Sequence, residues 1–475
     1  MMIFVRLFMT LALPFLLGYC LVAIIVGNKA ILTSFERFGL AWGIGLSLSG
    51  FFMFLVSLLG ISINIYTAAL PIIIILMPLI AYLVSKRIKF LDLPWLKDIG
   101  QKKLKEKLFI LLLGLMIFYV FLSALVKPIV NFDDLWRQGC IAKIIFMTGN
   151  IITPQTADLA GAHPYLNPIS QAGIYLGIGA WNDPLGKIIF PLCFTSLLFI
   201  FYSNLCRKSS RFYALLFTYL LTSFPLIVYH AGTAYSDLMQ TFYYFTGAIY
   251  LFRWMEEETS EHLVLSAIFF GIGNFVKQAG IPLWVVAAFV LFVFLFFEHK
   301  RNFRPGAIFL LLSTIVSSPW LFYRDSFLMS RLAKLFVSSA VTGQAAISPS
   351  LPYGSPTLVG ILSNLAKRAF TYADWQILWF VLLLVLLLGW QHIWRSKLKY
   401  LLLIIILDLG IIVYAFLDPN TYQFLVDGTL VNRLMMYLAP VTLYFIALAA
   451  RPLLCYQPKI GADTTKQRQA GKNRV

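Results

Sequence analysis

Charged residues are scarce in this sequence. Asp, Glu, Lys and Arg make up only 12% of its 475 residues, whereas hydrophobic residues make up 60% and the mean hydropathy is +0.83. This composition leaves too little polar surface to cover a soluble globule of that length. It therefore excludes a soluble protein and indicates a polytopic membrane protein, in which apolar runs of near-spanning length recur.

Cysteine and acidic residues are scarce as well. The five cysteines show no metal-binding spacing and require no disulfide. The first apolar run has no small-residue cleavage site, so we expect it to remain as a span. Only 20 Asp and Glu face 38 Lys and Arg, a formal net charge of +18. The basic residues gather in short connections between apolar runs. Their positions therefore indicate the membrane topology and contacts with anionic membrane lipids, and nucleic acid is not an expected partner.

The basic connections predict the orientation of the chain. The stretch 85–107 carries eight Lys and Arg, and the positive-inside rule places it in the cytoplasm. Counting onward, the basic stretches 207–211, 300–304 and 395–399 and the C-terminal tail fall on the same side. The expected fold is an all-α, polytopic transmembrane protein of about 13 spans with its N-terminus outside. The stretches 127–184, 230–237, 324–374 and 418–432 then face outward.

The chain divides into four regions and contains no predicted soluble domain. Residues 1–107 hold the N-terminal spans with the basic cytoplasmic loop, and residues 108–300 form a catalytic membrane core. Residues 301–450 hold the C-terminal spans with an outer loop at 324–374, and residues 451–475 form a basic cytoplasmic tail. Within the core, 150–184 is rich in Pro and Gly. We expect short broken helices there, lying at the interface, with 169–180 as the best helical candidate.

Two adjacent carboxylates, Asp133 and Asp134, follow the apolar run that ends near Val126. Ionisable residues at a membrane edge are commonly functional. The simpler interpretation is that Asp134 caps the helix that follows, because adjacent aspartates are common at helix starts.

Further polar residues collect on the same predicted outer face. Each also has a structural explanation: Asp237 can cap a span, the histidines can fix turns, Lys277 can snorkel from a span end, and the arginines can anchor a span at the interface. The candidates are His163, His230, Asp237, Lys277, Arg324 and Arg433.

The order of short motifs resembles the membrane-embedded lipid-sugar glycosyltransferases of the GT-C superfamily, closest to the family 39-type branch of protein O-mannosyltransferases and lipid A aminoarabinose transferases. The resemblance covers about residues 108–297 and, more loosely, 432–440. The loop reads His-Pro-Tyr-Leu where the family commonly has two prolines, and no large soluble C-terminal domain follows. The motifs are Asp133-Asp134, His163-Pro164-Tyr165-Leu166, Thr233 to Leu238, Gly271 to Gly280, and Asn432 to Pro440.

The resemblance implies an enzyme that transfers a sugar from a polyprenyl-phosphate carrier to a glycan, lipid or protein acceptor at the extracytoplasmic face of the cell membrane. Asp133 or Asp134 would take the proton of the acceptor hydroxyl. Asp237, His163 and His230 would bind substrate or acceptor, while Lys277, Arg433 and Arg324 would stabilise the phosphate that leaves.

A divalent metal, Mn, Mg or Zn, is chemically compatible with this interpretation. Asp134, His163 and Asp237 offer the oxygen and imidazole ligands that such ions prefer. Their spacing in the sequence does not establish a site.

Two other classes of protein stay open. A lipid-linked oligosaccharide polymerase or ligase would also work on the outer face, with Arg and His in a large late loop. A secondary transporter would show internal repeats and charges at mid-membrane. The clustering of carboxylates near the first outer stretch favours the glycosyltransferase.

Overall fold

Helices form the architecture of this chain. We describe it from a computed structural model, over residues 2–88, 103–161, 163–299, 301–342 and 355–454. Every regular element in these ranges is a helix, so the predicted all-α fold is confirmed for them. In chain order they are α1 (Met2–Val26), α2 (Ser34–Leu58), α3 (Ile65–Ser85), α4 (Leu104–Val126), η2 (Asp134–Gly139), α5 (Cys140–Thr148), α6 (Pro154–Ala160), α7 (Leu166–Ile178), α8 (Asp183–Gly186), α9 (Ile189–Lys208), α10 (Arg211–Thr222), α11 (Pro225–Ala231), α12 (Ser236–Glu257), α13 (Ser260–Val276), α14 (Gly280–Phe297), α15 (Arg304–Thr342), α16 (Leu358–Phe370), η3 (Ala373–Trp375), α17 (Leu378–Arg395), α18 (Leu398–Ala415), α19 (Pro419–Val426) and α20 (Val431–Leu454).

Ten helices in the described ranges are long and apolar enough to cross a membrane. An eleventh crossing results if α10 and α11, which meet at 75°, form one broken span. The polytopic membrane character is therefore supported, but the expected count of about 13 is not. The two remaining predicted spans correspond to α12, which is too polar, and α13, which is too short at 17 residues.

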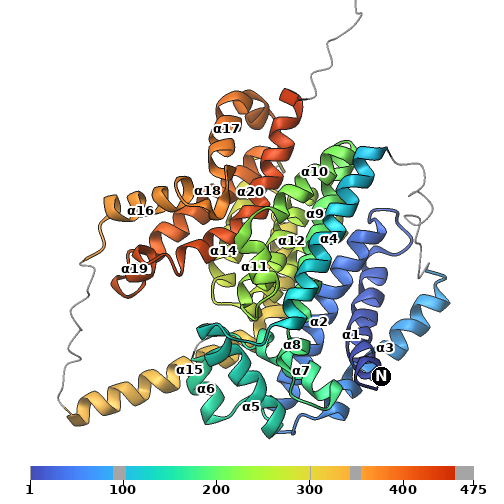
Figure 1. Cartoon of the computed structure of the whole chain (residues 1–475), viewed down its shortest axis with the longest axis vertical. Coiled ribbons are helices and arrows are strands. Elements are labelled where there is room, and N and C mark those ends of the chain that lie inside the picture. The colour runs from blue at the N-terminus through green and yellow to red at the C-terminus, as the bar shows by residue number, and fades with distance from the viewer. Residues whose placement is uncertain (1, 89–102, 162, 300, 343–354, 455–475) are drawn as a thin grey trace, which may run out of the picture.

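The polarity of α12 is explained by its place in the bundle. Every side chain from Ser236 to Met255 is buried, and the helix packs against α9, α13 and α20 (Figure 1). A helix enclosed by protein on all sides can carry polar groups that a lipid-facing helix cannot, provided that they find hydrogen-bond partners.

One end of the bundle gathers the basic connections, and we call it the basic end. Polar contacts link Lys208 to Glu256, Glu258 to His299, and Glu298 to Lys399. These residues come from helix ends that are far apart in the sequence. The described parts of the predicted cytoplasmic connections therefore lie together. Residues 89–102 of the first basic stretch and 455–475 of the tail lie outside the described residues.

The opposite end carries the segment between α4 and α9, and we call it the site end. It consists of the short elements η2 and α5 to α8, as the Pro and Gly content predicts. The predicted interfacial helix at 169–180 corresponds to α7, whose C-terminal carbonyl at Ile178 accepts a hydrogen bond from Arg6 at 3.3 Å. The first turn of α1 therefore lies at the site end too.

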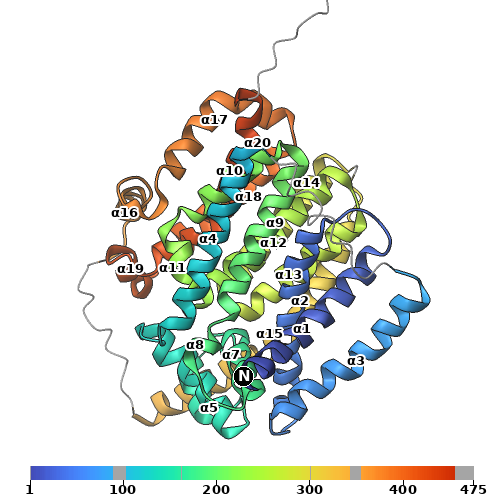
Figure 2. The same ribbon diagram turned by 45° about the vertical axis from the view of Figure 1, so that its right-hand side comes forward.

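The late outer stretch is more helical than expected. Helix α15 continues to Thr342, well beyond the predicted span end near residue 323, and α16 and α19 project from one side of the bundle (Figures 1 and 2). Residues 343–354 lie outside the described residues.

Candidate active site

The two aspartates point in different directions. Both follow the short connection after α4, and Asp134 opens a π-helical turn, an uncommon local geometry that is frequent at functional sites. The Asp133 side chain is 41% exposed, whereas Asp134 is only 1% exposed. The neighbouring carboxylates thus have different environments and can have different roles.

Only one of the two carboxylate oxygens of Asp134 accepts hydrogen bonds from described residues. The Asn131 amide and the Ala234 backbone N–H each donate a hydrogen bond of 3.0 Å to Oδ2. Within the described part of the chain, Oδ1 has no hydrogen-bond partner. Burial raises the pKa of this carboxyl to about 7, although the two hydrogen bonds act in the opposite direction. A free oxygen and a pKa near neutrality suit a general base.

Asp133 pairs with a residue from the end of the chain. Arg433, in the first turn of α20, donates a hydrogen bond of 2.6 Å to Oδ2 of Asp133. The guanidinium carbon of Arg433 also lies 4.5 Å from the centre of the Tyr235 ring. These contacts bring α20, η2 and the start of α12 together at the site end.

Asp237 is the buried anion of the site. It is 1% exposed, forms an ion pair with Lys277, and accepts a hydrogen bond of 2.6 Å from the Tyr437 hydroxyl. Lys277 stands where the chain breaks between α13 and α14, and the break allows its side chain to turn towards α12. Asp237 thus has charged and polar partners instead of acting only as a helix cap.

His163 lies in the loop before α7 and is partly buried. Burial and the positive charges of Arg137 and Lys277 lower its pKa to about 4, so the imidazole is neutral at neutral pH. A neutral imidazole can accept a proton or a hydrogen bond from a substrate. His230, by contrast, is 2% exposed and packs with its ring centre 4.8 Å from that of Tyr235, with no described partner for Nδ1.

The suggested metal ligands do not form a site. Among the described residues, no three His, Cys, Asp or Glu side chains are placed to hold a metal ion. Asp134 contacts Asn131 and Ala234, while Asp237 contacts Lys277 and Tyr437, so these two carboxylates have other neighbours. The proposed set of Asp134, His163 and Asp237 is therefore not supported.

Arg324 pairs with its neighbour in the chain. Its guanidinium donates hydrogen bonds of 2.9 and 2.6 Å to its chain neighbour Asp325. The helix α15, which the sequence did not predict to extend so far, carries both residues. The assignment of Arg324 to the donor phosphate has no structural support.

A cavity of about 410 Å³ lies beside Asp134, between α4 and α11. Its lining includes Asn131, Asp134 and Tyr229, and the Tyr229 hydroxyl donates a hydrogen bond of 2.7 Å to Asn131. Lys187, only 2% exposed, also lines it and donates a 2.6 Å hydrogen bond to the Lys127 carbonyl. This cavity places open space directly beside Asp134.

Several of these residues were not singled out from the sequence. Tyr437 is one turn after Arg433 on α20, a spacing that could have indicated a shared face. Asn131 lies three residues before Asp134 and was visible in the same motif. Lys187 and the buried Asp408, whose carboxylate accepts a hydrogen bond from Tyr244, are isolated polar residues near or within apolar runs.

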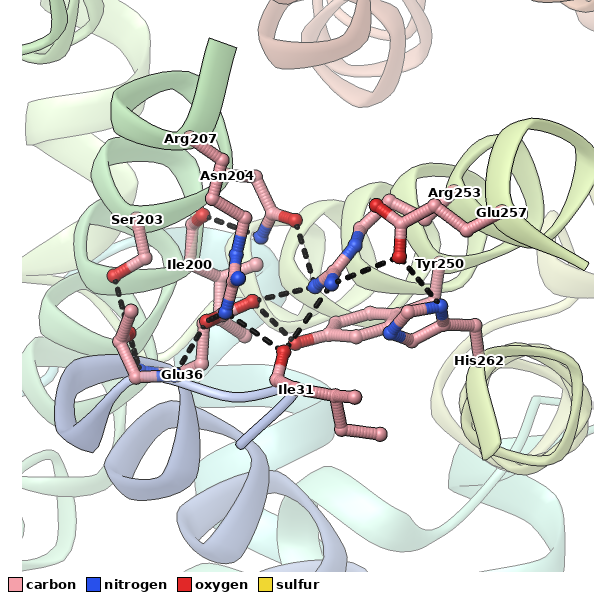
Figure 3. A network of polar contacts seen from close by, with 11 residues as sticks. Ile31, Glu36, Ile200, Ser203, Asn204, Arg207, Tyr250, Arg253, Glu257 and His262 are labelled. Carbon is pink, nitrogen blue, oxygen red and sulfur yellow. Dashed lines mark hydrogen bonds and ion pairs between the residues drawn. The ribbon is translucent and has the colours of Figure 1, made fainter. Parts of the chain in front are cut away.

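A second polar cluster lies at the basic end (Figure 3). Glu36, fully buried at the start of α2, accepts hydrogen bonds of 2.6 Å from Arg207, 2.7 Å from Arg253 and 3.1 Å from Tyr250. It also caps its own helix, through the backbone N–H of Thr33 at 2.7 Å. The Ile31 carbonyl accepts hydrogen bonds from the same two arginines. Because Glu36 bonds to side chains of α9 and α12, this cluster is a structural junction of α2, α9 and α12.

Comparison with known proteins gives no match: no family model, no curated protein and no solved structure is similar to this chain. The geometry of the site is therefore the basis for the functional conclusion.

Proposed function

We propose that this protein is an integral membrane glycosyltransferase. It transfers a sugar from a polyprenyl-phosphate carrier to an acceptor at the extracytoplasmic face of the cell membrane. One observation carries the proposal: three carboxylates and two cations from four distant segments meet at the site end of a membrane bundle, namely Asp133, Asp134, Asp237, Lys277 and Arg433.

Asp134 is the better of the two adjacent carboxylates for the role of base. The acceptor hydroxyl must lose its proton as its oxygen bonds to the anomeric carbon. Asp134 has an unpartnered oxygen and lines the cavity, whereas Asp133 is engaged by Arg433. The proton passes to Asp134 and the bond between the anomeric carbon and the phosphate oxygen breaks. The polyprenyl phosphate departs with the bonding electrons.

The two cations suit the departing phosphate. Lys277 donates one hydrogen bond to Asp237, and Arg433 donates one to Asp133. An ammonium group has three N–H donors and a guanidinium group has five. Each can therefore hold its aspartate and still donate to a phosphate oxygen. Fixed donors aimed at a developing charge stabilise the transition state without reorganisation.

The extracytoplasmic location rests on the arrangement of charge. The basic connections lie at the end of the bundle opposite the site, and basic loops of membrane proteins are typically cytoplasmic. The GT-C resemblance of the motifs is consistent with this sidedness.

The test is a transfer assay with purified protein in detergent and a panel of polyprenyl-phosphate sugars. We expect release of free polyprenyl phosphate from one donor and loss of turnover in Asp134→Asn. Turnover should be unchanged in the control Asp427→Asn, whose carboxylate accepts hydrogen bonds from Thr429 and from no other described residue. If no donor is consumed and the protein instead joins lipid-linked oligosaccharides or moves a solute into liposomes, the polymerase, ligase or transporter class replaces this one.

A further inference from the structure

A second cavity, of about 500 Å³, lies between α1, α2, α3 and α7, away from the carboxylates. Its walls are mainly apolar and include Leu46, Met53, Ile72 and Ile169. An apolar cavity at membrane depth is poorly suited to water, which needs two or more polar partners. Hydrocarbon is the chemically matched occupant.

Helix α3 forms the outer wall of this cavity and packs loosely. Only Ile72, Leu76 and Leu83 of its 21 residues are buried. Figure 2 shows α3 at the edge of the bundle, next to α1. Its large side chains Ile74 and Met77 are 61% and 69% exposed, as expected for a helix that faces lipid. A lipid chain can therefore reach the space between α3 and the bundle from the bilayer.

A cation stands at one end of the cavity. Arg6 lines it, is exposed, and lies in the first turns of α1 at the edge of the apolar run. Its guanidinium donates one hydrogen bond, of 3.3 Å, to the Ile178 carbonyl, and no described carboxylate lies within ion-pair distance of it. Arginine presents five donors that match phosphate oxygens in a paired geometry, so most of its donors are available for such a group.

We propose that this cavity binds one anionic membrane phospholipid. An acyl chain occupies the apolar space beneath α3, and the headgroup phosphate bonds to Arg6. The volume of the cavity, about 500 Å³, lies within the range of ligand pockets in proteins, roughly 300–1,000 Å³. The lipid fixes α3 against the bundle, and this role is independent of the proposed transfer reaction.

One glycine of α7 makes a sharp test possible. A Cβ on Gly173 would meet only the Met53 sulfur, at an ordinary 3.6 Å, so Gly173→Leu can fill the cavity. Gly177 is unsuitable, because a Cβ there would lie 1.9 Å from the Thr10 hydroxyl. Gly114 on α4 has nothing within 4 Å of such a Cβ, and Gly114→Leu is the matched control.

The experiment is native mass spectrometry of the full chain with added phosphatidylglycerol or phosphatidylcholine of identical acyl chains. We expect one phosphatidylglycerol to be retained per protein, and at least a tenfold weaker retention of phosphatidylcholine. Gly173→Leu should lose the lipid, whereas Gly114→Leu should keep it. Arg6→Gln should lose the preference for the anionic lipid. The control is Lys143→Gln, which removes a different cation of the site end, one that lies over the Trp181 ring, and this variant should keep the preference.

Three results would overturn the proposal. They are equal retention of the two lipids by the wild type, undiminished retention by Gly173→Leu, and displacement of the phospholipid by an equimolar polyprenyl phosphate. The last result would assign the cavity to the chain of the proposed donor.

Discussion

Arg433 donates a hydrogen bond of 2.6 Å to Asp133, which precedes it by 300 residues in the chain. One turn further along α20, Tyr437 donates a hydrogen bond of equal length to Asp237. A single face of the last helix therefore contacts two of the three carboxylates of the site. This geometry makes the position of α20 a determinant of the candidate active site.

Arg433→Gln should lower kcat/KM for the lipid-linked donor by about 10²-fold, because a fixed charged donor to the leaving phosphate is lost. Arg433→Lys should recover only part of the activity, since an ammonium cannot reproduce the planar paired geometry of a guanidinium. Steady-state transfer kinetics measure both effects. Arg451→Gln, near the other end of α20, is the control, and an equal loss there would point to a general effect on the helix.

Transfer should depend on pH through Asp134. Burial raises the pKa of this carboxyl to about 7, and the base must be deprotonated to accept the acceptor proton. We therefore expect kcat/KM to rise with pH through a single ionisation near 7. Asp134→Asn should lower kcat by roughly 10²- to 10⁴-fold. A wild-type profile that is flat between pH 5 and 9 would contradict this assignment.

Asp134→Asn should also make the folded protein more stable at alkaline pH. The folded-state pKa is raised, so the carboxyl is neutral in both states below about pH 4, and the cost of its burial develops as pH rises to about 7 and is fully present above it. Because both hydrogen bonds end on Oδ2, the amide oxygen of Asn can accept them. Thermal unfolding in detergent at pH 8 should show a higher Tm for the variant, and this difference should shrink at pH 5. A lower Tm at pH 8 would argue against a buried charge.

Removing one partner of the Asp237–Lys277 ion pair should be strongly destabilising. Lys277→Met leaves an unpaired buried carboxylate, and we expect a loss of about 3–5 kcal/mol in the free energy of unfolding. The double variant Asp237→Asn with Lys277→Met removes both charges and should regain most of the stability. It should not regain transfer activity. Chemical unfolding of Lys277→Met, Asp237→Asn and the double variant measures the first effect. Additive losses in the double variant would show that the two charges act independently.

The cluster at the basic end should affect stability without affecting the chemistry. Glu36→Ala removes the buried carboxylate that Arg207 and Arg253 share, although Arg253 keeps its contact with Glu257, and should lower the free energy of unfolding by about 3 kcal/mol or more. At a temperature where the variant remains folded, its kcat/KM should equal that of the wild type. A change in KM for the donor would indicate that the two ends of the bundle are coupled.

The sequence predicted features that depend on local patterns. Long apolar runs were sufficient to predict the all-helical class, and the basic connections were sufficient to predict that their described parts lie at one end of the bundle. Both signals can be read from short stretches of the chain. The same patterns do not reveal that α12 is enclosed by other helices. Its polarity is compatible with a membrane bundle only because other helices enclose it, and such enclosure is a tertiary property.

The sequence predicted which residues belong to the candidate site better than it predicted which of them contact one another. Asp133, Asp134, Asp237, Lys277 and Arg433 were all identified from the sequence, and the structure brings them together. Nothing local indicates that Arg433 pairs with Asp133, or that Tyr437 would reach Asp237. Such pairings depend on how α20 packs against α12.

The enclosed position of α12 has a consequence for the synthesis of the protein. Arg253, near one end of this helix, bonds to Glu36, which leaves the ribosome earlier, whereas Asp237 at the other end bonds to Lys277 and Tyr437, which leave later. A nascent chain that has just inserted α12 thus holds an unpaired anion until Lys277 arrives after α13, and Asp237 lacks its hydrogen bond from Tyr437 until the last helix arrives. Chains that end prematurely before α20 should be recognised and degraded by membrane quality control, even though most of their apolar helices are complete.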